Sequence, residues 1–473
     1  MKDLYEKTKK INHKIEDEGY ELIQIWECDF NDYKDIKKYM KKEWKRDFVA
    51  PLDPRDAFYG GRCEPATLKY KMKDNEKGRY IDVCSLYPTV NFFDYYPTGH
   101  PEKIKNPKKY NKKWYGLIKC KVLPPRKLYH PVLPYKEEKL IFSLCKSCSE
   151  TIKCKHHKTE SEKKRCKECY EIRNKECSHT DDERSFIGTW TTTEVKLALH
   201  KGYQILNIYE VWNFNTRSDT LFKDYVKMFL KIKLETDDKW SENFKTEEEY
   251  RRCVKEKLDI ELREIKKNPG MRFIAKICLN SLWDLNMIFL NDDCLEMKHK
   301  FKDEYVPDNF NTNIYIAAFT TSSARIRLYK MMDKLGDKVL YSDTDSIVYI
   351  DDGTNKAETG CMLGDWTDEL GEDKYIKTWI SPASKDYAYL MNDGTVGGKI
   401  KGFKMTYESE TKLYFEERMK IITEETDYID VEINQFQIQK DRNIKVNKTN
   451  KRYMFGFDKR RILDNFDTVL FGY

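Results

Sequence analysis

The chain of 473 residues has no apolar run long enough to cross a membrane and no recognisable signal peptide. We therefore expect an intracellular protein with no membrane partner. A strong excess of one charge is also missing, since 87 Lys and Arg against 80 Asp and Glu leave a net charge of +7. So small an excess permits a nucleic-acid partner without requiring one. The chain contains no internal repeat, and its length allows roughly two to four packed units.

Cysteine, by contrast, is plentiful, with 14 residues of which six fall within 33 positions. In a reducing compartment, clustered thiols favour a metal site over disulfides. Four of the six follow the pattern C-x2-C-x17-C-x2-C, which is typical of structural zinc sites. These four are Cys145, Cys148, Cys166 and Cys169.

Two aspartates lie one residue apart in the apolar stretch YSDTDSIVY at residues 341–349. Its aromatic and β-branched residues predict a strand, on which Asp343 and Asp345 would leave the same face. Neighbouring buried anions are costly unless a cation pairs with them. Ser-Asp-Thr-Asp-Ser is also rich in turn formers. The stretch alone therefore favours a metal site and a tight turn equally.

A second strand-like stretch, YIDVCSLYP at 80–88, carries Asp82 after an apolar lead-in. If this strand lies beside the first, three carboxylates converge. Hard oxygen ligands of this kind suit two Mg²⁺ ions, one for the attacking and one for the leaving oxygen of a phosphoryl transfer.

A helix is predicted in NPGMRFIAKICLNSLWDLN at 268–286, beginning after Pro269 and Gly270. Arg272, Lys276 and Asn280 follow one another at intervals of four and share one helical face. Two cations and an amide on one stripe suit a triphosphate. The alternative is a solvated basic stripe, which the position between the two carboxylate stretches makes the weaker interpretation.

The stretches DVCSLYP, KICLNSLW and YSDTDS resemble motifs A, B and C of family B DNA polymerases, in that order. FYGG at 58–61 and KDY at 385–387 resemble the YxGG and KxY motifs of the protein-primed branch, which occurs in Maverick/Polinton-type mobile elements and related viruses. The resemblance covers nearly the whole chain. It implies a monomeric DNA-directed DNA polymerase with an α+β fold and a right-hand architecture, which would act in the nucleus if the source is a eukaryotic mobile element.

The resemblance also implies a role for individual residues. The Mg²⁺ ligands would be Asp82, Asp343 and Asp345. The incoming deoxynucleotide would be bound by Tyr87, Arg272, Lys276 and Asn280, with Tyr87 as the steric gate against a 2′-hydroxyl. Primer–template DNA would be contacted by Phe58, Gly60, Gly61, Lys385 and Tyr387. For each aromatic residue, ordinary core packing is the alternative.

The implied domain order begins with a remnant of the exonuclease-to-palm linking region and ends with a thumb. The expected segments are 1–48 (linking region), 49–120 (first palm part), 121–215 (Cys-rich insert like the first terminal-protein region), 216–287 (fingers), 288–400 (second palm part) and 401–473 (thumb).

Three features depart from the family pattern. No Asp-x-Glu exonuclease motif precedes motif A, Asp284 takes the glycine position of motif B, and the segment from motif B to motif C is short. Most of the second terminal-protein region would then be missing, which predicts poor processivity. The alternatives to an active polymerase are a catalytically impaired remnant that only binds nucleic acid, and a template-binding module built around the zinc insert.

The resemblance adds a second way to complete the zinc site. In this branch, LCKSC is followed by a Cys-x-His pair like Cys177 and His179. Cys145 and Cys148 cannot serve two closed four-ligand sites, so either this pair or Cys166 and Cys169 would join them on one zinc ion. The alternative to a zinc site is a set of free thiols. Such a site would form a DNA-facing finger or staple a small insert.

Overall fold

The computed structural model describes residues 2–17, 49–136, 139–150, 176–237, 240, 244–280, 286–291, 294–298, 313–403, 407–438 and 443–473. The chain divides into two units, Met1–Pro51 and Leu52–Tyr473. The first contains helix α1 (Lys2–Asp17), whereas residues 18–48 of the expected linking region lie outside the described part. All elements below belong to the second unit.

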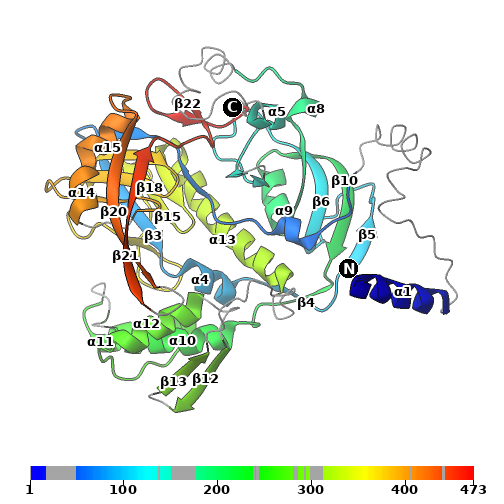
Figure 1. Ribbon diagram of the computed structural model, residues 1–473. Helices are drawn as coiled ribbons and strands as arrows, with labels where there is room; N and C mark the ends of the chain where they lie inside the picture. Colours follow the sequence, from blue (N-terminus) through cyan, green and yellow to red (C-terminus); the bar gives the residue numbers. More distant parts are fainter. Residues whose placement is uncertain are drawn as a thin grey trace. The chain divides into compact units, whose positions relative to one another are not determined.

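A nine-stranded antiparallel sheet forms the centre of this unit (Figure 1). Its main path runs β1-β14-β15-β3-β17-β18-β19, while β16 pairs with β3 and β2 pairs with β17. The strands are β1 (Cys63–Pro65), β2 (Lys69–Lys71), β3 (Lys77–Val83), β14 (Val339–Asp343), β15 (Ser346–Asp351), β16 (Trp366–Asp368), β17 (Ile376–Ala383), β18 (Asp386–Met391) and β19 (Val396–Lys399).

The two faces of this sheet differ because successive strand residues point to opposite sides. One face packs against helix α13 (Ile314–Leu335), where Ile81 and Ile347 meet Leu328 and Met332. The other face carries a layer of aromatic rings. They are Tyr80, Tyr341, Trp379, Tyr387 and Tyr389.

A second sheet of four strands runs in the order β5-β10-β6-β9. Its strands are β5 (Glu102–Lys105), β6 (Gly116–Leu123), β9 (Phe186–Thr191) and β10 (Gln204–Asn213). Helix α9 (Thr192–His200) follows β9 directly, with the Thr191 hydroxyl capping its first turn. Because β5 and β6 belong here, the first part of the central sheet ends before residue 102. The expected first palm part, 49–120, thus includes strands of this second sheet, and its boundary remains a prediction.

Between the two halves of the central sheet, the chain forms helices α10 (Lys223–Glu235), α11 (Glu247–Leu258) and α12 (Pro269–Asn280). A hairpin of β12 (Asn286–Asn291) and β13 (Cys294–Lys298) follows α12. The helix predicted after Pro269 is thus confirmed. Asp284 lies outside the described residues.

The last part of the chain packs helix α15 (Phe415–Ile422) and the long hairpin of β20 (Tyr428–Ile438) and β21 (Ile444–Met454) against β17 and β18. The remaining elements are η1 (Pro54–Ala57), α4 (Leu86–Phe93), β4 (Tyr96–Thr98), β7 (Tyr135–Lys136), β8 (Leu140–Ile141), α5 (Lys146–Glu150), α8 (Asp181–Arg184), β11 (Thr216–Ser218), η2 (Gly336–Lys338), α14 (Tyr407–Lys412), β22 (Arg461–Ile462) and β23 (Thr468–Val469). Across the described residues, no helix combines the length and apolar character that a bilayer-spanning segment needs.

Candidate active site and candidate metal centre

The three aspartates meet at one corner of the central sheet, which we call the carboxylate corner (Asp82, Asp343 and Asp345). Strand β3 pairs with β15 so that Asp82 lies opposite Ser346, the residue after Asp345. The backbone N–H of Val83 also donates to the Asp345 carbonyl at 2.8 Å. Two strands that lie far apart in the sequence, β3 and β15, therefore bring Asp82 and Asp345 together.

The prediction that Asp343 and Asp345 leave one face of a single strand was wrong. Strand β14 ends at Asp343, Thr344 and Asp345 form the turn, and β15 begins at Ser346. Thr344 adopts φ 57°, a left-handed conformation that a β-branched residue rarely takes. The tight turn that the residues also favoured is thus what forms, and it carries Asp345 to Asp82.

Burial and mutual repulsion dominate the electrostatics of this corner. Burial, then the charges of Asp345 and Glu369, raise the pKa of Asp82 to about 7, while the charge of Lys276 lowers it. Burial and the charge of Asp343 raise the pKa of Asp345. Asp82 Oδ1 is buried with no hydrogen-bond partner among the described residues. A bare buried carboxylate oxygen is costly, and a cation is the partner that would relieve it.

The carboxylates are not, however, a closed ligand set. Among the described residues, only the Cys/His group below brings three or more ligand atoms within 4.8 Å of one another. The oxygens of Asp82, Asp343 and Asp345 are therefore more widely spaced. Mg²⁺ is commonly held by one or two carboxylates, with water and substrate phosphates completing the shell. Asp82 and Asp345 fit that pattern.

Lys385 lies at the same corner. It occupies the turn between β17 and β18 with φ 63°, and its Nζ is 3.6 Å from Asp343 Oδ1. Its backbone N–H donates to the Tyr341 hydroxyl at 3.0 Å, which ties the two hairpins together. Lys385 is half exposed.

Tyr387, predicted to contact the primer, is only 7% exposed. Its ring stacks on Trp379 at 5.3 Å, and its hydroxyl lies 3.0 Å from that of Tyr80. The structure therefore places the ring in the core, as the alternative interpretation held, because β18 alternation turns it toward the aromatic face.

The FYGG loop approaches the carboxylate corner through Gly61. A β-carbon on Gly61 would lie 2.6 Å from Thr344 Oγ1, whereas one on Gly60 would meet nothing within 4 Å. Phe58 is 45% exposed. The close approach that glycine permits here is thus to the aspartate turn itself, and Phe58 and Gly60 remain open to solvent.

The residues predicted to bind the nucleotide lie on two helices, α12 and α4. Arg272, Lys276 and Asn280 lie on the outward stripe of α12, and Arg272 Nε is 3.0 Å from Asp237 Oδ1. Tyr87 lies half-buried on α4, where burial and the charge of Asp345 raise its pKa. Lys276 and Tyr87 thus lie close enough to the carboxylate corner for charge effects between them and its aspartates, and the binding roles of all four residues remain predictions.

Lys233 on α10 also reaches motif A, and no motif in the sequence singles it out. Its Nζ donates to Ser85 Oγ at 3.0 Å, beside motif A. Burial lowers its pKa, and the nearby charges of Arg272 and Lys276 lower it further. In the sequence it is one of several lysines along a charged helix, and only the packing of α10 on α4 distinguishes it.

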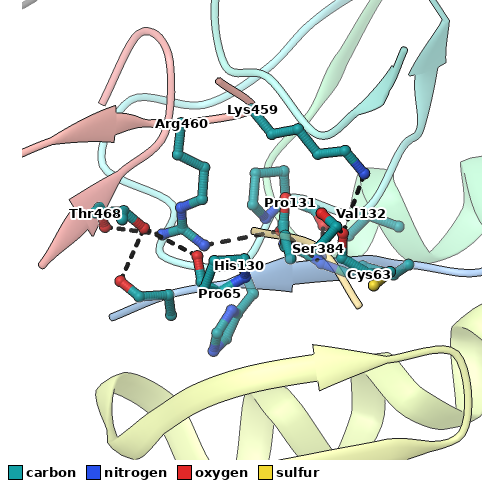
Figure 2. Close-up of polar contacts among 12 residues, drawn as sticks. Cys63, Pro65, His130, Pro131, Val132, Ser384, Lys459, Arg460 and Thr468 are labelled. Carbon is teal, nitrogen blue, oxygen red and sulfur yellow. Dashed lines mark hydrogen bonds and ion pairs between the residues drawn. The ribbon is translucent and has the colours of Figure 1, made fainter. Parts of the chain in front are cut away.

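The segment after β21 donates hydrogen bonds to β1, the strand that pairs with β14 next to Asp343 (Figure 2). Lys459 Nζ and Ser384 Oγ both donate to the Cys63 carbonyl, at 3.1 and 2.8 Å. Thr468 Oγ1 donates to the Pro65 carbonyl at 3.1 Å, and Arg460 donates to the Thr468 carbonyl at 3.1 Å. Since Cys63 pairs with Asp343 across β1 and β14, these bonds position the aspartate hairpin.

A second candidate site, the thiol corner (Cys145, Cys148, Cys177 and His179), has four ligand atoms within 4.8 Å of one another. His179 Nδ1 lies 3.5, 3.3 and 3.6 Å from the sulfurs of Cys145, Cys148 and Cys177. Of the two completions left open, the structure brings the Cys177 and His179 pair together. Cys166 and Cys169 lie outside the described residues.

The donor set of the thiol corner fits zinc. Three sulfurs and one imidazole nitrogen form a closed four-ligand set of the structural type. The hydrogen bond between Cys145 and Cys148 is the main cause that lowers the pKa of Cys145 to about 5, and it raises the pKa of Cys148, so the two sulfurs share a proton. Arg126 donates to the carbonyls of Cys177 and His179 at 3.2 and 2.8 Å, which orients this half of the set.

The chain is similar to known DNA polymerases in part of its sequence and in its fold. Residues 31–155 match the family model described as DNA polymerase type B, organellar and viral. None of the curated proteins compared with the chain matches it. Among solved structures, phi29 DNA polymerase complexed with primer–template DNA is similar at 15% identity and a TM-score of 0.51, over 88% of this chain and 66% of that chain.

The same polymerase in a ternary complex with incoming nucleotide substrates gives 15% identity and a TM-score of 0.49, over 90% of this chain and 66% of that chain. The binary-complex likeness shows the fold and confirms the α+β, right-hand architecture. The chain spans just under two thirds of the phi29 polymerase chain, at 66%.

Proposed function

We propose that this chain is the catalytic core of a family B DNA polymerase, which adds deoxynucleotides to a primer 3′ end. One observation carries the proposal. The pairing of β3 with β15 sets a buried, unpaired oxygen of Asp82 beside Asp345, at a corner that Lys276 and Tyr87 also face. A structural carboxylate would have a hydrogen-bond or ion-pair partner there.

The surrounding side chains would have separate roles in the reaction. Lys276, Arg272 and Lys233 would neutralise the triphosphate, and Tyr87 would pack beneath the sugar. Lys385, 3.6 Å from Asp343, would orient the primer terminus for attack on the α-phosphate. Mg²⁺ held by Asp82 and Asp345, with Asp343 beside them, would supply charge stabilisation at the attacking and leaving oxygens.

Primer extension by Asp345→Asn and Asp82→Asn variants tests this function. Each should lose about a thousandfold or more of the extension rate, because a catalytic metal contributes several kcal/mol to the barrier. Binding of primer–template DNA should persist. Asp393→Asn, which alters a carboxylate in the turn between β18 and β19, is the matched control. Extension at the parent rate by Asp345→Asn would refute the proposal.

A catalytically impaired remnant is the second candidate, and the short segment from motif B to motif C favours it. The two are separated by the parent chain itself. Extension that rises with Mg²⁺ identifies a polymerase, whereas DNA binding with no extension at any Mg²⁺ concentration identifies the remnant.

The finer features of the proposal come from the protein-primed resemblance. The primer would be a hydroxyl on a terminal protein, and the template the genome of a mobile element or virus. The hairpin of β12 and β13 is the element that follows motif B, and its strands are short. We expect few nucleotides added per binding event, which single-cycle extension on a long template would measure.

We also propose that one zinc ion binds at the thiol corner. The supporting observation is the four-atom set of Cys145, Cys148, Cys177 and His179. The site lies beside the final residues, since the Leu144 N–H donates to the Phe471 carbonyl at 2.8 Å. Zinc would therefore fasten the insert to the segment that carries Lys459 and Arg460.

A further inference from the structure

A cavity of about 800 Å³ lies on the side of the central sheet opposite Asp82. Val83 lines it, and neighbouring strand residues point to opposite faces. Its walls come from α4, α9 and α13, and Figure 1 shows α13 running between the other two helices. The catalytic proposal uses none of the side chains that line this cavity.

The lining is strongly cationic. It includes one carboxylate, Asp94, and five cations: Lys196, Arg217, Arg327, Lys330 and Lys334. Arg327 Nη2 pairs with Asp94 Oδ1 at 2.8 Å. Lys196 and Lys330 are exposed, and no ion pair joins either of them to a carboxylate in the described part of the chain. Uncompensated cations around one cavity repel each other and favour a polyanionic ligand.

Aromatic side chains share the same cavity. Phe93 and Tyr95 line it and are 42% and 48% exposed. The Arg217 guanidinium lies 4.8 Å from the Tyr95 ring centroid, so this ring is held in place on one side. Cations beside exposed aromatic faces are the combination that binds single-stranded nucleic acid, through phosphates and stacked bases together. An acidic peptide would use the cations alone.

We propose that this cavity is a second DNA-binding site, which takes a single-stranded segment on the face of the sheet away from the carboxylate corner. Lys196 and Lys330 contact phosphates, and a base stacks on Tyr95. The strand has two sources with the same chemistry: unpaired template ahead of the primer, or the strand displaced during synthesis. The site does not depend on catalysis, so it survives failure of the polymerase proposal.

Binding of a labelled single-stranded oligonucleotide to the full chain carrying Asp345→Asn tests the site without turnover. Adding Lys196→Ala and Lys330→Ala removes two phosphate contacts, which should lower the slope of log K against log salt by about 1.4. Tyr95→Ala should weaken binding about fivefold or more. The control is Lys108→Ala with Lys109→Ala, exposed lysines between β5 and β6 and outside the cavity.

A slope that stays at the parent value, or that falls equally in the control, would overturn the proposal. So would competition by polyglutamate that matches competition by unlabelled oligonucleotide. Two further substrates separate the sources of the strand. If the variants bind more weakly only to a primer–template with a long template overhang, the site takes the template. If they bind more weakly only to a fork with a 5′-tailed strand, the site takes the displaced strand. An equal loss on both means that the site accepts either.

Discussion

The carboxylate corner and the thiol corner are both candidate metal sites, and they are built in opposite ways. The thiol corner places four soft donors within 4.8 Å of one another, and the carboxylate corner does not bring even three oxygens that close. At the carboxylate corner, burial raises the pKa of Asp82 to about 7. At the thiol corner, hydrogen bonding lowers the pKa of Cys145 to about 5.

This difference follows from what each site would do. A closed four-ligand set leaves no position for a substrate, so its metal holds the fold together. An open set of hard oxygens is completed by the oxygens of a substrate, so its metal can take part in a reaction. Folding alone therefore brings together all four ligands of the thiol corner. The carboxylate corner needs oxygens from a substrate to complete the coordination of its metal. Each prediction below is aimed at one of the two corners.

The largest effect is expected from Cys177→Ser. The variant should lose its zinc and about 4 kcal/mol or more of unfolding free energy, since loss of a structural metal is among the most damaging single changes. Metal analysis and denaturant unfolding measure both. Cys253→Ser on α11 is the control, because Cys253 is also half-buried but lies outside the thiol corner.

A Cys166→Ser variant completes this test. It should keep its zinc, because the Cys177 and His179 pair closes the site. Loss of zinc from Cys166→Ser together with full retention in Cys177→Ser would assign the site to the other pair.

Tyr87→Ala should act on the carboxylate corner alone. Removing the ring from beneath the sugar should reduce discrimination against ribonucleotides by about 10- to 100-fold, roughly 1–3 kcal/mol. Zinc content should not change. The ratio of kcat/KM for ribonucleotides and deoxyribonucleotides measures the effect, with exposed Tyr414→Ala as the control. Unchanged discrimination would make Tyr87 a core residue.

Acid should weaken the support of the carboxylate corner through His130. Its Nε2 lies 2.9 Å from the Gly336 carbonyl, where α13 leads into β14. Burial, then the charge of Arg62, lowers its pKa to about 3. At pH values between this pKa and the unfolded value of about 6.5, His130 is protonated in the unfolded chain and neutral in the folded chain. Stability therefore falls as the pH drops below about 6.5, by about 2 kcal/mol at pH 5.

His130→Gln keeps a donor for Gly336 and removes that titration, so its stability should fall less between pH 7.5 and pH 5. Denaturant unfolding at both pH values measures this, with exposed His200→Gln as the control. The loss of stability between pH 7.5 and pH 5 that remains in His130→Gln can be compared with the release of zinc over the same pH range. If His130→Gln and the parent lose the same stability, His130 is not the acid-sensitive group.

The sequence predicts much of the carboxylate corner because its elements are local. The strand before Asp82, the β-rich stretch around Asp345 and the helix after Pro269 all follow from side-chain periodicity. Periodicity does not show which sheet face a helix will cover, so it could not tell that Tyr387 would be buried. Nor could it separate strand from turn at Thr344, since the same residues suit both. Lys233 and the cationic cavity depend on packing between helices far apart in the chain.

The smallest effect is expected from Gly61→Ala, which pushes on the aspartate turn without removing a ligand. The new β-carbon would lie 2.6 Å from Thr344 Oγ1, so the turn must shift, at a cost of about 1 kcal/mol. Extension should slow because Asp345 moves with the turn, and zinc content should stay constant. Gly60→Ala is the control, since its β-carbon meets nothing within 4 Å. Thr344→Gly removes the clashing side chain and accepts φ 57° without strain, so Gly61→Ala combined with Thr344→Gly should recover stability. Equal behaviour of Gly61→Ala and Gly60→Ala would show that the FYGG loop does not control the carboxylate corner.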